Sequence, residues 1–166
     1  MIKKFFYIFC MIIFINSCNV AKKEKNIFFN IDAAIENIVI QLLQSKNIII
    51  NKNTLFFAHT LNNNGTININ AKKITDIIKN TITKYNDKII FISEKKINQS
   101  KQKLGLSNEK NVRNTSIAIL LSRSNHAEYY LESNVSGYTK PFLLTLKLIL
   151  TKTGEIIFLK TAKFNY

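Results

Sequence analysis

The segment Phe142-Leu-Leu-Thr-Leu-Lys-Leu-Ile-Leu150 carries the clearest structural signal in this chain. Its leucines recur at every second position and alternate with Thr145 and Lys147, the two-residue period of a strand with one face in a core. Thr153-Gly154 then predicts a tight hairpin into a further strand over 155–163. We therefore predict that the C-terminal part of the chain forms an antiparallel pair of strands in a sheet.

Upstream of this hairpin, helical and strand-like patterns alternate along the chain. Asn30 and Asn70 precede apolar residues at i, i+3 and i+4 spacing and are predicted N-caps. The predicted helices cover 30–46, 70–85, 93–104 and 113–124, and further predicted strands cover 54–61, 88–92 and 127–135. The order α-β-α-β-α-α-β-β-β predicts an α/β fold of α+β type, in which helices pack on a mixed sheet.

The N-terminus has the layout of a bacterial lipoprotein signal. Lys3 and Lys4 precede an uncharged run over 5–15, and Asn16-Ser17 then leads to Cys18. We expect 1–17 to be the signal peptide, Cys18 to carry the lipid, 18–29 to be a short tether and 30–166 to be the globular domain. The alternative is an uncleaved membrane anchor, but the uncharged run is shorter than the roughly 20 residues that span a bilayer as a helix.

Composition argues against several classes of function. The formal net charge is +14, which usually suggests nucleic acid or an anionic surface. However, Arg113 and Arg123 are the only arginines, and arginine carries most bidentate base readout. We therefore expect no nucleic-acid partner.

The cysteines argue against a disulfide or a cysteine metal site. We expect Cys10 to leave with the signal and Cys18 to be lipidated, so no thiol would remain for either.

No catalytic pattern stands out in the sequence. His59 and His126 belong to no metal-spaced cluster, and no Gly-rich phosphate loop is present. Ser93-Glu-Lys-Lys96 matches the letters of a Ser-x-x-Lys nucleophile motif, but it lacks the partner motifs and is better explained as a helix start. We predict a non-enzymatic protein without catalytic residues, metal, cofactor or small-molecule substrate.

Several blocks in the C-terminal half resemble the LpoB family of lipoprotein activators. They are Lys101-Gln-Lys-Leu-Gly-Leu-Ser107, Asn125-His-Ala-Glu-Tyr-Tyr-Leu131, Val135-Ser-Gly137 and Leu150-Thr-Lys-Thr-Gly-Glu-Ile-Ile-Phe158. The resemblance implies a small domain similar to the N-terminal domain of TolB. It also implies a lipid-anchored protein at the outer membrane, facing the periplasm. The implied partner is a bifunctional penicillin-binding protein, a peptidoglycan synthase, whose regulatory domain the lipoprotein would bind and activate allosterically.

The chain departs from this family in its tether. The relatives carry a long Pro-rich linker after the lipidated cysteine, whereas the single proline here, Pro141, lies inside the predicted domain. About a dozen residues reach about 40 Å when fully extended. Asn19, next to the lipid site, is not the aspartate that favours retention at the inner membrane, which supports the outer membrane.

The predicted strand 127–135 offers a candidate partner surface. Alternation places Glu128, Tyr130, Glu132 and Asn134 on one face and Ala127, Tyr129, Leu131 and Val135 on the core face. Exposed aromatic and charged side chains together suit a partner contact. The predicted partner-binding set is Arg123, Glu128, Tyr130, Glu132 and Asn134.

Other interpretations stay open. The predicted surface is equally compatible with an ordinary solvated strand. A structural lipoprotein of the same fold could serve another envelope or flagellar assembly. An envelope hydrolase is the less favoured third possibility, because no carboxylate pair facing one cleft is evident.

Overall fold

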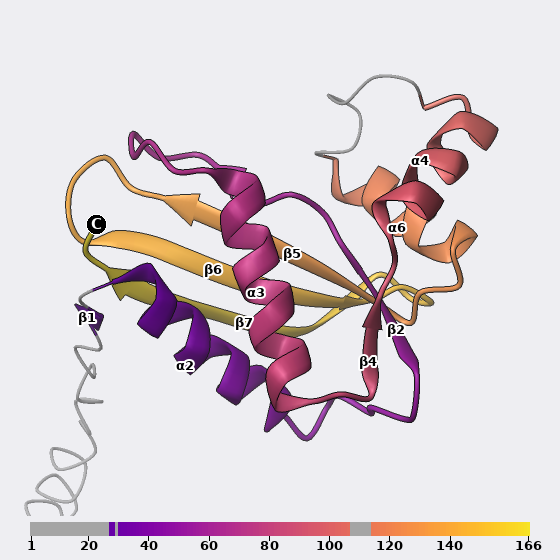
Figure 1. The fold of residues 1–166 in the computed structure, drawn as a ribbon, viewed down its shortest axis with the longest axis horizontal. Coiled ribbons are helices and arrows are strands. Elements are labelled where there is room, and N and C mark those ends of the chain that lie inside the picture. Colours follow the sequence, from indigo (N-terminus) through magenta and orange to yellow (C-terminus); the bar gives the residue numbers. More distant parts are fainter. Residues whose placement is uncertain (1–26, 29, 107–113) are drawn as a thin grey trace, which may run out of the picture.

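A computed structural model describes residues 27–28, 30–106 and 114–166, which form one mixed sheet with helices on both of its faces (Figure 1). The helices are α2 (Ile31–Leu43), α3 (Ala71–Tyr85), α4 (Glu94–Lys103) and α6 (Thr115–Ser124). The strands are β1 (Ile27–Phe28), β2 (Thr54–Ala58), β3 (Asn62–Asn63), β4 (Ile89–Phe91), β5 (Tyr129–Ser136), β6 (Phe142–Leu150) and β7 (Glu155–Phe164). The predicted α/β fold is confirmed.

The sheet has the strand order β1-β7-β6-β5-β2-β4, with β3 paired to β5. β5, β6 and β7 are antiparallel, as the hairpin signal predicts. β2 runs parallel to both of its neighbours, β4 and β5. Parallel strands need crossover connections, and the helices supply them. The predicted order of helices and long strands is therefore observed in full.

Side-chain caps explain where the two long helices begin. Asn30 Oδ1 accepts a hydrogen bond of 2.8 Å from the Ala33 N–H at the start of α2. Asn70 Oδ1 accepts one of 3.0 Å from the Lys73 N–H at the start of α3. Each bond satisfies a backbone donor that has no partner inside the helix, so both predicted N-caps are confirmed.

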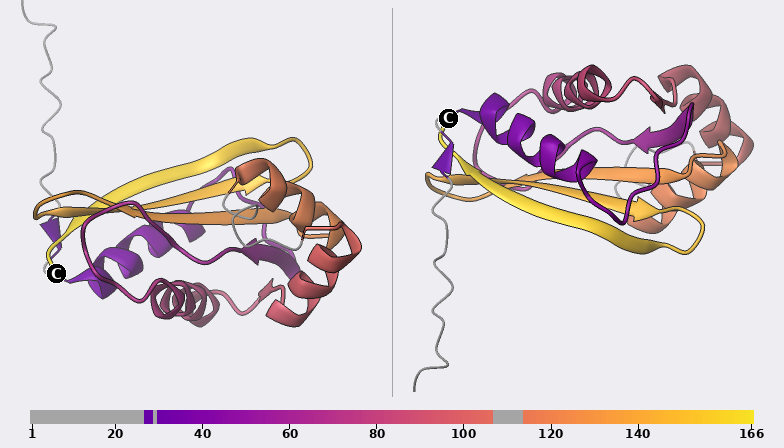
Figure 2. Two further views of the ribbon diagram at one scale, coloured as in Figure 1. Left: turned by 90° about the horizontal axis from the view of Figure 1, so that it is seen from above. Right: turned by 90° about the horizontal axis from the view of Figure 1, so that it is seen from below.

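The main core lies between the sheet and the pair α2 and α3. The apolar face of α2 meets the inward leucines of β6, among them Leu144 and Leu146, which are both fully buried. Phe56 of β2 points into this core. Figure 2 shows both long helices on the same side of the strands.

A second, smaller core lies on the opposite face, at one end of the sheet. Phe57, next to Phe56 on β2, points into it together with Tyr130 of β5 and Ile149 of β6. Ile97 of α4 and Leu121 of α6 close it from outside. Figure 2 shows these two helices gathered at that end. The sheet is thus covered on both faces at one end and on one face along the rest of its described length.

Two short strands go beyond the predicted elements. β3 lies between the predicted strand 54–61 and the predicted helix 70–85, and its two asparagines pair with Asn134 and Val135 of β5. β1 falls within the expected tether and pairs in parallel with the end of β7. The expected signal peptide over 1–17 and the lipid site Cys18 lie outside the described residues.

Candidate docking surface

The open part of the sheet presents three cross-strand rows of side chains, opposite the face that α2 and α3 cover. The pairing registers of β5, β6 and β7 define these rows. We call the nine side chains the open face. They are Glu132–Lys147–Leu159, Asn134–Thr145–Thr161 and Ser136–Leu143–Lys163.

The first row is held by a half-buried ion pair. Lys147 Nζ lies 2.9 Å from Glu132 Oε1, and the two side chains are 26% and 16% exposed. Thr115, the first residue of α6, donates a hydrogen bond of 3.1 Å to Glu132 Oε2. The N-terminus of α6 therefore abuts this row, and the rest of the open face extends away from the helix.

The second row contains an unsatisfied polar atom. Thr145 and Thr161 share a hydroxyl–hydroxyl bond of 2.9 Å. Beside them, Asn134 Oδ1 is buried and has no hydrogen-bond partner among the described residues. Buried acceptors without a partner are rare in native folds. The Asn134 side chain is thus half-buried on the open face, and its oxygen is shielded from solvent.

The structure divides the predicted partner-binding residues into two groups. Glu132 and Asn134 lie together on the open face, as the alternation predicts. Arg123 and Glu128 are exposed near the other end of α6, a helix about 15 Å long. No structural observation tests a partner contact for any of these residues, so that role stays a prediction.

Arg123 has a structural partner in the turn between β6 and β7. Its Nε donates a hydrogen bond of 2.6 Å to the Thr151 carbonyl, and its Nη2 donates one of 3.1 Å to the Lys152 carbonyl. The side chain therefore ties the end of α6 to the hairpin that the Thr153-Gly154 pair predicts.

The expected exposure of Tyr130 is wrong. Tyr130 shares the strand face of Glu132 and Asn134, but it is only 3% exposed because α4 and α6 cover that end of the sheet. Its ring lies 5.6 Å from that of Phe57, between centroids. Burial, and secondarily the negative charge of Glu132, raise the pKa of the Tyr130 phenol well above its usual value.

A sequence signal for this burial exists. Tyr129, Tyr130 and Leu131 form a continuous apolar run and are all buried. Such runs are typical of strands that are covered on both faces. Lys147 is the open-face residue that sequence reasoning missed as a partner for Glu132, because cross-strand register cannot be read from one strand alone.

The described residues contain no group of three or more His, Cys, Asp or Glu side chains that could hold a metal ion. Within the same part of the chain, no helix is both long and apolar enough to cross a membrane. Separately, the pairing registers place polar, charged and apolar side chains side by side on the open face, a mixture that protein contact surfaces often show.

A family model described as "Peptidoglycan-synthase activator LpoB" matches residues 29–164. The chain belongs to the LpoB family. The family is one of activators, so the prediction of a regulatory protein that is not an enzyme is confirmed at the level of the family. The resemblance of the C-terminal blocks is confirmed in the same way.

Individual relatives support this assignment. The protein BU358 of Buchnera aphidicola subsp. Acyrthosiphon pisum is 41% identical over 160 residues, which cover 90% of this chain and 95% of that protein. The penicillin-binding protein activator LpoB of Pantoea ananatis is 31% identical over 133 residues, covering 80% of this chain. The match spans 66% of that LpoB, just under two thirds of its length.

A solved structure shares the LpoB fold described above. The LpoB C-terminal domain from Salmonella enterica superposes with a TM-score of 0.73 and 27% identity. The match covers 81% of this chain and 98% of the Salmonella domain. The open face and the two cores thus belong to an LpoB-type domain.

Proposed function

We propose that this chain is an outer-membrane lipoprotein that binds a bifunctional penicillin-binding protein and activates its peptidoglycan synthesis. The match to the LpoB family over residues 29–164 is the observation that carries this proposal. In it, Cys18 is the lipid attachment site, the domain faces the periplasm, and a small regulatory domain of the synthase is the docking partner.

The open face is the surface that we assign to this contact. It combines the Glu132–Lys147 pair, the buried acceptor of Asn134 and the exposed side chain of Leu159. An interface core of this kind gains apolar burial and orients its partner through polar groups.

Activation then follows from differential binding. A partner that docks more tightly on the active conformation of the synthase shifts its population towards that conformation. A coupling free energy of about 1–3 kcal/mol changes such an equilibrium by about 5–150-fold. The lipoprotein needs no catalytic residue for this effect.

A binding and activity experiment with the full chain tests the proposal. The purified chain is expected to bind its cognate synthase and to increase the rate of glycan polymerisation. Thr161→Arg adds a bulky cation to the open face and should weaken binding by about tenfold or more, since misplaced bulk and charge are costly at an interface core. Asn80→Arg adds the same group to an exposed position on α3 and is the matched control.

The outcomes separate the alternatives. Failure of the unmodified chain to bind or stimulate the cognate synthase would contradict the proposed activation. Loss of binding with Asn80→Arg but not with Thr161→Arg would contradict the assigned surface. Glu128→Lys tests whether the second group, around Arg123 and Glu128, also contributes to the contact.

A further inference from the structure

The helices that follow β2 and β4 pack on opposite faces of the sheet. These strands are parallel neighbours. After β2 the chain continues to α3, which packs in the main core, and after β4 it continues to α4, which packs in the second core on the opposite face. In open α/β sheets, ligands bind in the crevice beyond the carboxyl ends of strands at such a switch point.

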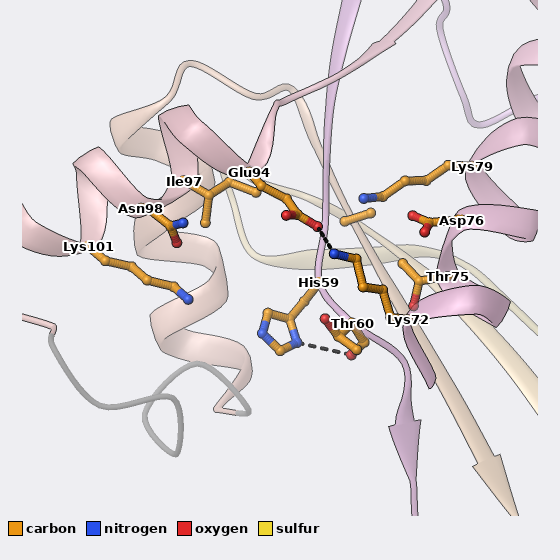
Figure 3. A pocket seen from close by; sticks show the side chains of 11 residues that line it. His59, Thr60, Lys72, Thr75, Asp76, Lys79, Glu94, Ile97, Asn98 and Lys101 are labelled. Carbon is orange, nitrogen blue, oxygen red and sulfur yellow. Dashed lines mark hydrogen bonds and ion pairs between the residues drawn. The ribbon is translucent and has the colours of Figure 1, made fainter. Parts of the chain in front are cut away.

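A cavity of about 280 Å³ lies at this position. It is lined by residues from α3 and α4 and by residues 58–60, at the end of β2 and just beyond it. Figure 3 shows Lys72, Lys79 and Lys101 directed into it from the two helices. The volume is just below the range of about 300–1,000 Å³ that drug-sized ligands occupy, so the cavity suits a small ligand.

The cavity is rich in cations that carboxylates only partly balance. Three lysines and two carboxylates, Asp76 and Glu94, line it. Lys72 Nζ lies 3.5 Å from Glu94 Oε1, and the two side chains are 68% and 67% exposed. A pair this exposed contributes little stability and exchanges readily with solvent, so it links α3 to α4 across the cavity only weakly.

Lys79 and Lys101 are unusual among the lysines of this chain. Within the described residues, every lysine is exposed except Lys79, Lys101 and Lys147. Lys147 has its carboxylate partner, Glu132. Lys79 and Lys101 are half-buried, both line the cavity, and neither forms an ion pair with a described residue. Partial burial of an ammonium group that forms no ion pair is unfavourable, and an anion bound in the cavity would pair with both lysines.

We propose that this cavity binds a small oxyanion ligand, one that carries a phosphate or carboxylate group. Lys79 and Lys101 pair with the anionic group, and the Thr60 hydroxyl and the Asn98 amide line the same space for the rest of the ligand. An incoming anion also competes with Glu94 for Lys72. The site lies at the β4 side of the sheet, whereas the open face spans β5 to β7, so it is separate from the proposed docking surface.

Titration of the isotopically labelled full chain, followed by amide NMR shifts, tests this inference. Inorganic phosphate and malonate are the two probes, with sodium chloride at equal ionic strength as the reference. We expect saturable shifts confined to 58–60, 72–79 and 94–101 with at least one probe. The probe that saturates at lower concentration identifies the phosphate or the carboxylate class.

Four charge-changing variants sharpen the test. Lys79→Gln and Lys101→Gln should each weaken the binding of the probe severalfold, because each removes one cation from the site. Lys160→Gln removes the same charge from an exposed position on β7 and should leave binding unchanged. Glu94→Gln should tighten binding, since it removes a competing carboxylate and frees Lys72.

Two results would overturn the inference. One is shifts that do not saturate or that sodium chloride reproduces. The other is an equal loss of probe affinity in Lys160→Gln and in the two cavity variants. All these variants change exposed or half-buried side chains, so we expect them to fold. Their amide spectra check directly that the fold is intact.

Discussion

At the residue scale, the environment of Tyr130 has a consequence for stability at high pH. The phenol is buried between Phe57 and the two helices α4 and α6, and Glu132 follows two positions later on the same strand face. Burial penalises the charged phenolate, and the carboxylate of Glu132 repels it. The folded state therefore holds this proton more tightly than the unfolded state does.

Stability should accordingly fall as the pH rises above about 10, the ordinary pKa of tyrosine. The pKa of Tyr130 is raised in the folded state. The contribution of its protonated phenol to the free energy of unfolding is therefore complete below that pH and is lost as the pH increases. The free energy of unfolding can fall by up to about 1.4 kcal/mol for each pH unit because of this one group. Tyr130→Phe should flatten this part of the profile, as measured by urea unfolding between pH 8 and 11.

Tyr138 provides the control for this measurement. It is 82% exposed, so Tyr138→Phe should keep the wild-type pH dependence. Equal profiles for wild type and Tyr130→Phe would show that the Tyr130 phenol is accessible to water at high pH.

At the scale of secondary-structure elements, β6 is the strand on which the main core depends. Leu146 lies at its centre, is fully buried, and pairs with Ser133 on one side and Lys160 on the other. Leu146→Ala should destabilise the domain by about 2–5 kcal/mol, the range for large-to-small changes in a core.

Leu159 is the matched control on the neighbouring strand. It is 55% exposed on the open face, so Leu159→Ala should change stability by no more than about 0.5 kcal/mol. Chemical denaturation of both variants checks the pair. Similar losses for Leu146→Ala and Leu159→Ala would mean that the register of β6 and β7 differs from the one described.

The elements that the sequence predicts are those in which apolar and polar residues alternate with the period of a strand or a helix. β6 alternates leucine with polar residues, and its observed bounds agree with the predicted ones. α3 likewise repeats isoleucine on one face. β1 and β3 show no such pattern, because each is a strand of only two residues that pairs through its backbone.

The candidate sites needed tertiary information. Alternation placed Tyr130, Glu132 and Asn134 on one face of β5, and that placement is confirmed. It could not show that α4 and α6, which come earlier in the chain, fold over only the Tyr130 end of this face. The cavity lysines Lys79 and Lys101 come from separate helices, and in the sequence they look like the other surface lysines.

At the scale of the whole molecule, the position of the proposed anchor limits where the domain can act. Nine residues lead from Cys18 to Ile27, the first residue of β1. Fully extended, they reach about 30 Å. Under the proposed function, the synthase must therefore present its regulatory domain close to the membrane that holds the lipid.

Cys18→Ser tests the anchor. The variant should appear in the soluble periplasmic fraction or remain unprocessed, because no sulfur is left to carry the lipid. Fractionation of cells and the mass of the purified protein measure this outcome. An unchanged mass together with unchanged membrane association would contradict lipidation at Cys18.

If the chain is anchored at Cys18 as proposed, the pairing of β1 with β7 has a mechanical consequence. Two residue pairs hold β1 to the sheet, a short attachment between the proposed lipid site at Cys18 and the core that begins with α2. Tension between membrane and synthase would peel β1 away while the long hairpin β6–β7 stays intact. Release of β1 would add the stretch from Ile27 to the start of α2 to the connection, a gain of at most about 13 Å. In a pulling experiment, the detachment of β1 from β7 would appear as a short extension at low force before global unfolding.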